Sequence, residues 1–324
     1  MDEQLIYPIF VRQGRSPRNS KAGFIIANGD VVIPPTFEDA RPLVNGLASV
    51  RIGEQWGAIA LSGQLVISPI SDWPLYFCHG VSKYGSRGRF GVVDARGTVL
   101  LRPKYERMGR YSEGLAWVFA NSLYGFIDTV GHEQIPPFFE DARNFAEGAA
   151  PVKIGGKWGY IDKQARLVID PRFDFACIFR EGYARVMVGK EWGYIDHAGA
   201  FMVPPQYGDA RDFHEGLAQV QSGELWGYLN ARGELQIAPG FGRVAEFSEG
   251  LASVQRPGEF KEGFITQDGN VAIPAQFLDT APFNAGVCHV LTLKEIGYID
   301  RAGQFVWRGP YVDVGVGLIG RGLM

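Results

Sequence analysis

Cysteine and histidine are scarce in this sequence, with 3 and 5 residues among 324. Cys78, Cys177 and Cys288 lie far apart, and so sparse and odd a set argues against a disulfide framework and for a reducing compartment. No two histidines lie four residues apart, and a metal site needs three or four converging ligands. We therefore expect no metal site. The histidines are His79, His132, His197, His214 and His289.

Long apolar runs are also missing, since no stretch approaches the roughly 20 residues that span a bilayer. The short apolar run near the N-terminus is broken by Pro8 and ended by Arg12, which is not a secretory signal. The sequence further lacks a Gly-rich phosphate loop with a Lys and a Gly-x-Ser-x-Gly motif. These absences predict a cytoplasmic protein with no membrane role, no cofactor and no catalytic residues. An enzyme with an unrecognised site remains an alternative.

Glycine, proline and aromatic residues are abundant, with Gly 43, Pro 19 and Phe 22. Such a composition indicates many turns joining short strands. The glycines recur every 34 residues, apart from one interval of 36 before Gly263. We call this glycine the anchor of each repeat. The anchors are Gly23, Gly57, Gly91, Gly125, Gly159, Gly193, Gly227, Gly263 and Gly297.

Other positions follow the same period. A second glycine stands six residues after each anchor except at Ala165, prolines recur twelve residues after it, and aromatics recur fourteen after it. An Asp followed three residues later by Gly fits a hairpin turn whose last residue has positive φ. We therefore expect Ala165 to be a strained exception.

The repeat anchored at Gly159 predicts strands at 159–162, 167–169 and 184–188. Pro171 should stop the second strand because it donates no N–H. The segment 172–181 is expected to form a helical turn or compact loop. The prediction is an all-β chain of nine three-stranded antiparallel units that bury their aromatics only by stacking. An open superhelical stack is preferred, and a closed propeller-like ring is the alternative.

The predicted organisation is an N-terminal strand or cap over residues 1–22 and one continuous repeat domain over residues 23–324. Ile9–Val11 resembles the third strand of a preceding unit and is expected to pair with the first hairpin. The repeat stays in phase through Tyr311 and Gly320 and decays at Arg321–Met324.

Three segments carry a resemblance to a known family. They are Lys157–Asp162 (KWGYID), Glu191–Asp196 (EWGYID) and Leu225–Asn230 (LWGYLN), together with the Phe-x-Glu-Gly-Leu-Ala-x-Val pattern of 213–220 and 247–254. The sequence resembles the WG-repeat (KWG-repeat) family of tandem β-repeats, found mainly in bacterial proteins, over about residues 21–320. The resemblance implies a β-repeat fold and implies no reaction.

Residues that recur once per repeat are interpreted as serving the fold. Glu113, Glu147, Glu181, Glu215 and Glu249 form one such column, for which turn capping is preferred over cation binding. The recurring Asp residues are interpreted as turn formers. The recurring Trp residues are interpreted as packing between units, although a row of aromatics could also stack sugars or bases.

The distinctive departure from the pattern lies in repeats 2 and 3. Between residues 83 and 110 there are eight Lys or Arg residues against only Asp94 and Glu106, with aromatics nearby. Arginine with aromatics is typical of protein-interface hot spots, while an uneven solvated surface would also explain the composition. The candidate partner-binding residues are Trp73, Tyr76, His79, Lys83, Arg87, Arg89, Arg107, Arg110 and Trp117.

The sequence thus predicts a non-catalytic binding scaffold whose partner is another protein, because repeat arrays present extended surfaces. Binding of a carbohydrate or cell-wall ligand through the aromatic columns is the alternative. Nucleic acid is not the expected partner, because the sequence pI is only about 6.0. The sequence does not specify the oligomeric state.

Overall fold

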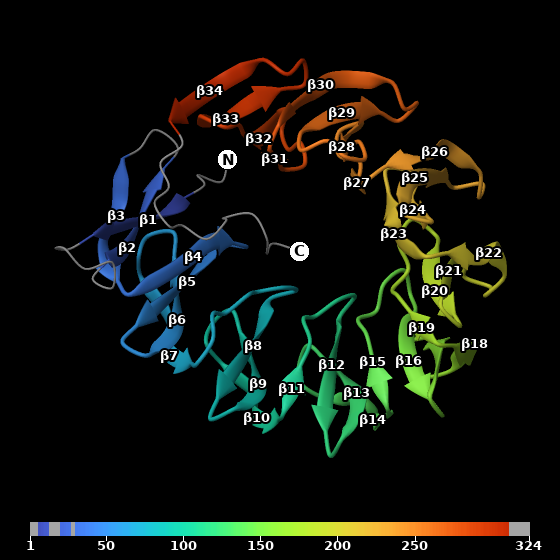
Figure 1. The fold of residues 1–324 in the computed structure, drawn as a ribbon. Helices are drawn as coiled ribbons and strands as arrows, with labels where there is room; N and C mark the ends of the chain where they lie inside the picture. Colours follow the sequence, from blue (N-terminus) through green and yellow to red (C-terminus); the bar gives the residue numbers. More distant parts are fainter. Residues whose placement is uncertain (1–5, 13–19, 27–29, 311–324) are drawn as a thin grey trace. The chain divides into compact units, whose positions relative to one another are not determined.

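The structure is a computed structural model that describes residues 6–12, 20–26 and 30–310. Within these residues every regular element is a β-strand (Figure 1). The chain divides into two compact units, Met1–Pro171 and Arg172–Met324. No helix in the described part of the chain has the length and apolar character to cross a bilayer.

The first unit is built from five consecutive antiparallel sheets. Its strands are β1 (Ile6–Arg12), β2 (Ser20–Ile26), β3 (Val31–Phe37), β4 (Asp39–Val44), β5 (Leu47–Ile52), β6 (Gln55–Ala60), β7 (Leu65–Ser71), β8 (Val81–Ser86), β9 (Arg89–Asp94), β10 (Val99–Tyr105), β11 (Arg107–Met108), β12 (Leu115–Ala120), β13 (Leu123–Asp128), β14 (Glu133–Phe139), β15 (Asp141–Ala142), β16 (Ala150–Ile154) and β17 (Lys157–Ile161). β18 (Leu167–Phe173) completes the fifth sheet and contains the boundary at Pro171.

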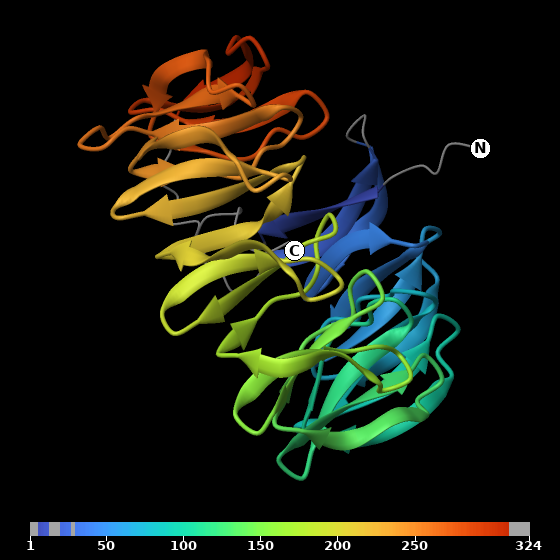
Figure 2. The ribbon, with the colours of Figure 1, turned by 90° about the vertical axis from the view of Figure 1, so that its right-hand side faces the viewer.

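The second unit contains the remaining four sheets, each of four strands. Its strands are β19 (Phe175–Ala176), β20 (Ala184–Val188), β21 (Glu191–Ile195), β22 (Phe201–Tyr207), β23 (Asp209–His214), β24 (Leu217–Ser222), β25 (Leu225–Asn230), β26 (Leu235–Phe241), β27 (Arg243–Val244), β28 (Leu251–Gln255), β29 (Glu262–Thr266), β30 (Val271–Phe277), β31 (Asp279–Thr280), β32 (Val287–Leu291), β33 (Glu295–Asp300) and β34 (Phe305–Pro310). Figure 2 shows successive sheets of this unit lying face to face.

The predicted three-stranded unit is wrong for seven of the nine sheets in the described residues, which have four strands. The additional strand comes from the segment expected to be a helical turn or loop. β19 pairs with β20 through Phe175 and Met187 and through Ala176 and Val186. Two residues give no alternating pattern, so sequence periodicity could not reveal this strand.

The fourth strand per sheet also bears on the arrangement of the repeats. Four-stranded antiparallel sheets repeated along a chain are the blades of β-propellers. The sheets therefore support the propeller-like alternative, and the preferred open superhelical stack of three-stranded units is not supported.

Pro171 was predicted to stop the second strand of its repeat, but β18 continues through it to Phe173. The equivalent prolines of β22 show the reason, because they lie in a bulge. On β22, Val203 pairs with Tyr194 and Tyr207 pairs with Trp192, so the strand carries two more residues than its partner between these pairs. Pro204 and Pro205 lie in this excess stretch. A bulge on an outer strand leaves residues out of the hydrogen-bond ladder, so a missing N–H costs little there.

The same bulge explains the anchor glycine. A Cβ built on Gly193 would lie 2.5 Å from the carbonyl oxygen of Val203 and 2.7 Å from the nitrogen of Pro205. Both are backbone atoms, so no side-chain rotation relieves the overlap. The Gly of the Trp-Gly motif is therefore required by the close approach of the bulged strand.

Adjacent sheets seal each other's apolar faces, as the repeat analysis predicted. Phe213 of β23 packs against Tyr194 of the preceding sheet at 5.2 Å between ring centroids. Phe145 packs against Phe126 in the same way at 4.9 Å in the first unit. All four side chains are no more than 1% exposed. In both pairs the following sheet thus supplies the aromatic that closes the core of the sheet before it.

The chain's N-terminal strand behaves as expected. β1 pairs antiparallel with β2 from Ile6 opposite Ile26 to Arg12 opposite Ser20. The prediction that the repeat continues through Tyr311 and Gly320 and decays at 321–324 lies outside the described residues.

Ala165 is a strained exception, as predicted, because it adopts a φ of 62° at a turn position that is otherwise glycine. A left-handed conformation costs a residue with a Cβ roughly 1–2 kcal/mol. We expect Ala165→Gly to raise the free energy of unfolding by about 1 kcal/mol, measured by urea denaturation.

The matched control is Gly131→Ala, which places a Cβ at the equivalent turn of the preceding repeat. Gly131 has a φ of 88°, and its Cβ would lie 2.9 Å from the Cβ of Leu101. This variant should be destabilised. Equal stabilities for the wild type and Ala165→Gly would contradict the strain argument.

Candidate interaction surface

The recurring glutamates act as caps between repeats. Glu181 has a φ of 51°, and its carboxylate accepts the backbone N–H groups of Glu215 at 2.9 Å and Gly216 at 2.8 Å in the following repeat. Glu215 caps Glu249 and Gly250 at 2.6 and 2.8 Å. Glu113 and Glu249 reach Gly148 and Gly286 in the same way. The predicted capping role is confirmed, and these carboxylates are engaged by backbone donors.

The recurring Asp residues form turns, also as predicted. The Oδ1 atom of Asp128 accepts the N–H groups of Val130 at 3.0 Å and His132 at 2.8 Å. The pKa of Asp128 is lowered although burial raises it, because these N–H groups and the Gln134 side chain stabilise the carboxylate. No cluster of three or more metal-ligating side chains occurs in the described part of the chain.

Trp56 and Trp158 serve packing, because only 5% and 3% of their surface is exposed. Each is covered by an arginine, with the Arg41 guanidinium 4.9 Å and the Arg143 guanidinium 5.2 Å from the ring centroid. These two tryptophans therefore do not offer an open stacking platform.

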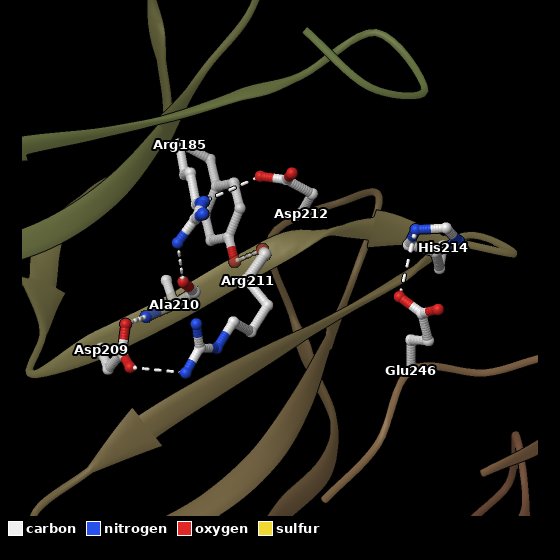
Figure 3. A network of polar contacts seen from close by, with 8 residues as sticks. Arg185, Asp209, Ala210, Arg211, Asp212, His214 and Glu246 are labelled. Carbon is white, nitrogen blue, oxygen red and sulfur yellow. Dashed lines mark hydrogen bonds and ion pairs between the residues drawn. The ribbon is translucent and has the colours of Figure 1, made fainter. Parts of the chain in front are cut away.

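Two arginines of the second unit, Arg185 and Arg211, are paired with carboxylates (Figure 3). Arg185 donates to the Asp212 carboxylate at 2.7 Å and to the Ala210 carbonyl at 2.6 Å. Arg211 lies 3.2 Å from the Asp209 carboxylate. Arg185 reaches from β20 to β23 of the next sheet, whereas Arg211 and Asp209 lie on the same strand. The acidic side chains balance the charges of both arginines.

The corresponding positions in the first unit carry positive charges. Lys83 has the repeat position of Arg185, and Arg110 has that of Asp212. Lys83 Nζ donates to the Met108 carbonyl at 2.8 Å, which is the contact that Arg185 makes with Ala210. Burial lowers the pKa of Lys83, and the nearby charge of Arg110 lowers it further.

Arg110 is exposed and lies over the Tyr76 ring at 5.5 Å. The Tyr76 side chain is itself 44% exposed. We call Tyr76, Lys83 and Arg110 the Arg110 cluster. Among the described residues, no carboxylate lies within ion-pair distance of Lys83 or Arg110.

A third cation, Arg107, lies three residues before Arg110 on the same segment. Arg107 replaces the aspartate that occupies this repeat position as Asp209. Its guanidinium lies 5.8, 5.6 and 5.8 Å from the ring centroids of Trp117, Phe119 and Tyr124. No ion pair of Arg107 occurs in the described part of the chain. The result is an exposed guanidinium held over three aromatic rings.

Gly109 makes this arrangement possible. It takes the repeat position of Arg211, and a Cβ there would lie 2.3 Å from Nε1 of Trp117. The indole of Trp117 therefore occupies space that a side chain would otherwise fill. Phe119, Tyr124 and Gly109 were missed by sequence analysis. A comparison of repeat positions for exchanged charges would have pointed to this sheet.

The other predicted residues are dispersed. Trp73 is 59% exposed, and its ring lies against Gly85. His79 occupies a turn with a φ of 54°, where its Nδ1 lies 3.1 Å from the Cys78 sulfur. Arg87 is exposed in the hairpin between β8 and β9. No contact of His79 or Arg87 with the Arg110 cluster appears among the described residues.

Arg89 lies at a separate polar cavity of about 490 Å³ in the first unit. Its guanidinium donates to the Lys104 carbonyl at 2.7 Å. Glu133 accepts from Lys104 Nζ at 2.9 Å and from the Tyr105 hydroxyl at 2.8 Å. Burial and this hydrogen bond raise the pKa of Tyr105 to about 12. Of the charged residues that line this cavity, Lys104 and Glu133 thus form an ion pair.

Comparison with protein families gives one match. The model for the WG containing repeat matches residues 23–56, 90–124, 124–158, 158–192, 192–226 and 226–256. These segments cover more than half of the chain. No curated protein sequence matches significantly.

Solved structures show a likeness of fold. The structure described as the eukaryotic initiation factor has a TM-score of 0.60 and 12% identity, with 95% of this chain and 96% of that chain covered. Apo AztD from Citrobacter koseri has a TM-score of 0.42 and 13% identity, with 94% and 95% covered. Only the first similarity is strong enough to support an argument, and at this identity it concerns the fold alone.

The electrostatic repulsion between Lys83 and Arg110 yields a testable prediction. Replacing Arg110 with Gln removes the positive charge beside Lys83, so we expect the pKa of Lys83 to rise. Titration of ¹³C-labelled lysine side chains by NMR measures this shift. Arg232→Gln, at an exposed site in the second unit, serves as the control and should leave the pKa of Lys83 unchanged. An unchanged value in Arg110→Gln would show that the two charges do not interact.

Proposed function

Because the chain belongs to the WG containing repeat family, and its recurring residues are engaged in turns and packing, we propose that it is a non-catalytic scaffold that binds another protein. The contact surface is the off-pattern region of the first unit around the Arg110 cluster and Arg107. Residues at positions that vary between repeats are not needed for the turns and the packing of the fold, so they are available for binding.

The observation that carries this proposal is the presence of exposed arginines without carboxylate partners. Arg107 and Arg110 lie over aromatic rings, whereas Arg185 and Arg211 in the second unit also meet Asp212 and Asp209. A guanidinium stacked on an aromatic face is weakly hydrated and has already lost part of its rotational freedom. Binding to it therefore costs less than binding to a freely moving arginine.

An exposed aromatic belongs to the same region, because Tyr76 of the Arg110 cluster leaves 44% of its surface exposed. Tryptophan, tyrosine and arginine are the residues enriched at the energetic centres of protein interfaces. The sequence pI of about 6.0 disfavours nucleic acid as the main partner.

We expect the double variant Arg107→Glu/Arg110→Glu to lose at least about tenfold in recovery of the partner, the loss typical of an interface hot spot. The immobilised chain is incubated with a lysate of its source organism, and captured proteins are quantified by mass spectrometry. The thermal midpoint should stay within a few degrees of the wild type, since both side chains are exposed.

The control is Arg166→Glu/Arg232→Glu, which makes the same charge change at side chains that are 75% and 82% exposed. It should capture the partner as the wild type does. Equal recovery by the two double variants would reject this surface as the contact site.

A further inference from the structure

We infer that Lys83 and Arg110 form an anion-binding site that takes carboxylates of an acidic peptide segment. The inference rests on the proposed function and names the chemistry of the partner. The repeat positions of both residues vary along the chain, and the two residues come from consecutive sheets of one unit.

Comparison of equivalent repeat positions provides the first argument. In the second unit, the cation at the position of Lys83 meets an aspartate at the position of Arg110, with 2.7 Å between Arg185 Nε and Asp212 Oδ1. In the first unit both positions are cationic, and the charges of Lys83 and Arg110 repel each other. An external anion between them would restore the balance that Asp212 provides internally.

The site is also held in place before any ligand arrives. Lys83 Nζ is fixed by its hydrogen bond to the Met108 carbonyl and lies 5.3 Å from the centroid of Phe90. An ammonium group has three donors, so that hydrogen bond leaves Lys83 with donors for a ligand. Arg110 is positioned by Tyr76.

The spacing of cations favours a peptide over a small ion. Arg107 lies three residues from Arg110 on the same segment, and Trp117, Phe119 and Tyr124 position its guanidinium separately. A peptide with several carboxylates can contact both arginines and pack against exposed Tyr76. A single inorganic anion can use only one of the two positions, so it should bind more weakly.

The test uses the full chain and fluorescein-labelled hexaglutamate, followed by fluorescence anisotropy at constant ionic strength. Wild type should bind the peptide at least about tenfold more tightly than Arg110→Asp, because this variant loses a charge-assisted contact and also places a negative charge against the acidic peptide. The same variant recreates the pairing of Arg185 with Asp212. Its thermal midpoint should therefore rise by about 1–2 °C.

Arg110→Gln is the second variant, which removes the charge without introducing a carboxylate. It should weaken hexaglutamate binding at least about threefold, as expected for one rim charge. Arg232→Asp is the matched control and should leave both binding and the midpoint unchanged. Equal affinities for wild type, Arg110→Asp and Arg110→Gln would overturn the site.

Two competitors decide the ligand class. Inorganic phosphate at equal charge concentration should displace little hexaglutamate, and a short oligothymidylate should compete less well than unlabelled peptide. Stronger competition by either would overturn the assignment to an acidic peptide.

Arg110-dependent hexaglutamate binding, combined with unchanged partner capture by Arg107→Glu/Arg110→Glu, would refute the proposed function while the anion site stands. Hexaglutamate binding that does not depend on Arg110, combined with lost partner capture by Arg107→Glu/Arg110→Glu, would refute the anion site alone.

Discussion

The structure depends on the packing of each sheet against the next. A sheet does not enclose its own aromatics, because the phenylalanine that covers Tyr194 is Phe213 of the following sheet. This dependence explains why aromatic residues recur at the same positions along the chain. A residue that changes at such a position disturbs two sheets, so variation is confined to positions outside the shared core.

That constraint separates residues that build the fold from residues available for binding. The anchor glycine, the turn aspartates and the capping glutamates are all used by the backbone. Lys83, Arg107 and Arg110 depart from the pattern and produce three cations where equivalent positions of the second unit hold one arginine and two aspartates. Among the described residues these three cations have no carboxylate partner. In the network of Figure 3, by contrast, Asp212 and Asp209 neutralise the charges of Arg185 and Arg211.

Sequence periodicity predicted the strands, the hairpin turns, the pairing of the N-terminal strand and the strain at Ala165. It failed at the fourth strand, because β19 has two residues and the expected loop has no alternation. It also misplaced the role of proline, since the bulge that accommodates Pro205 arises only when β21 and β22 pair.

For the candidate site, composition drew attention to the region that we propose as the contact surface but not to its geometry. Lys83 and Arg110 come from different repeats, so only the packing of sheets brings them together. Phe77 and Tyr84, two other aromatic residues of this region, are each 6% exposed and belong to the core. Phe119 and Tyr124 were overlooked because Arg107 approaches them only after β11, β12 and β13 have paired.

The glutamate caps have a consequence for how the second unit loses structure. Glu181 ties its repeat to the turn of the next, and Glu215 and Glu249 continue the series as far as Gly286. Ala285 occupies the next position in the column and has no carboxylate to extend it. Local opening of a sheet that holds one of these glutamates would leave the amide donors of the next turn without their acceptor. Loss of structure in one repeat of this unit is therefore coupled to the repeat that follows it, through one carboxylate at each step.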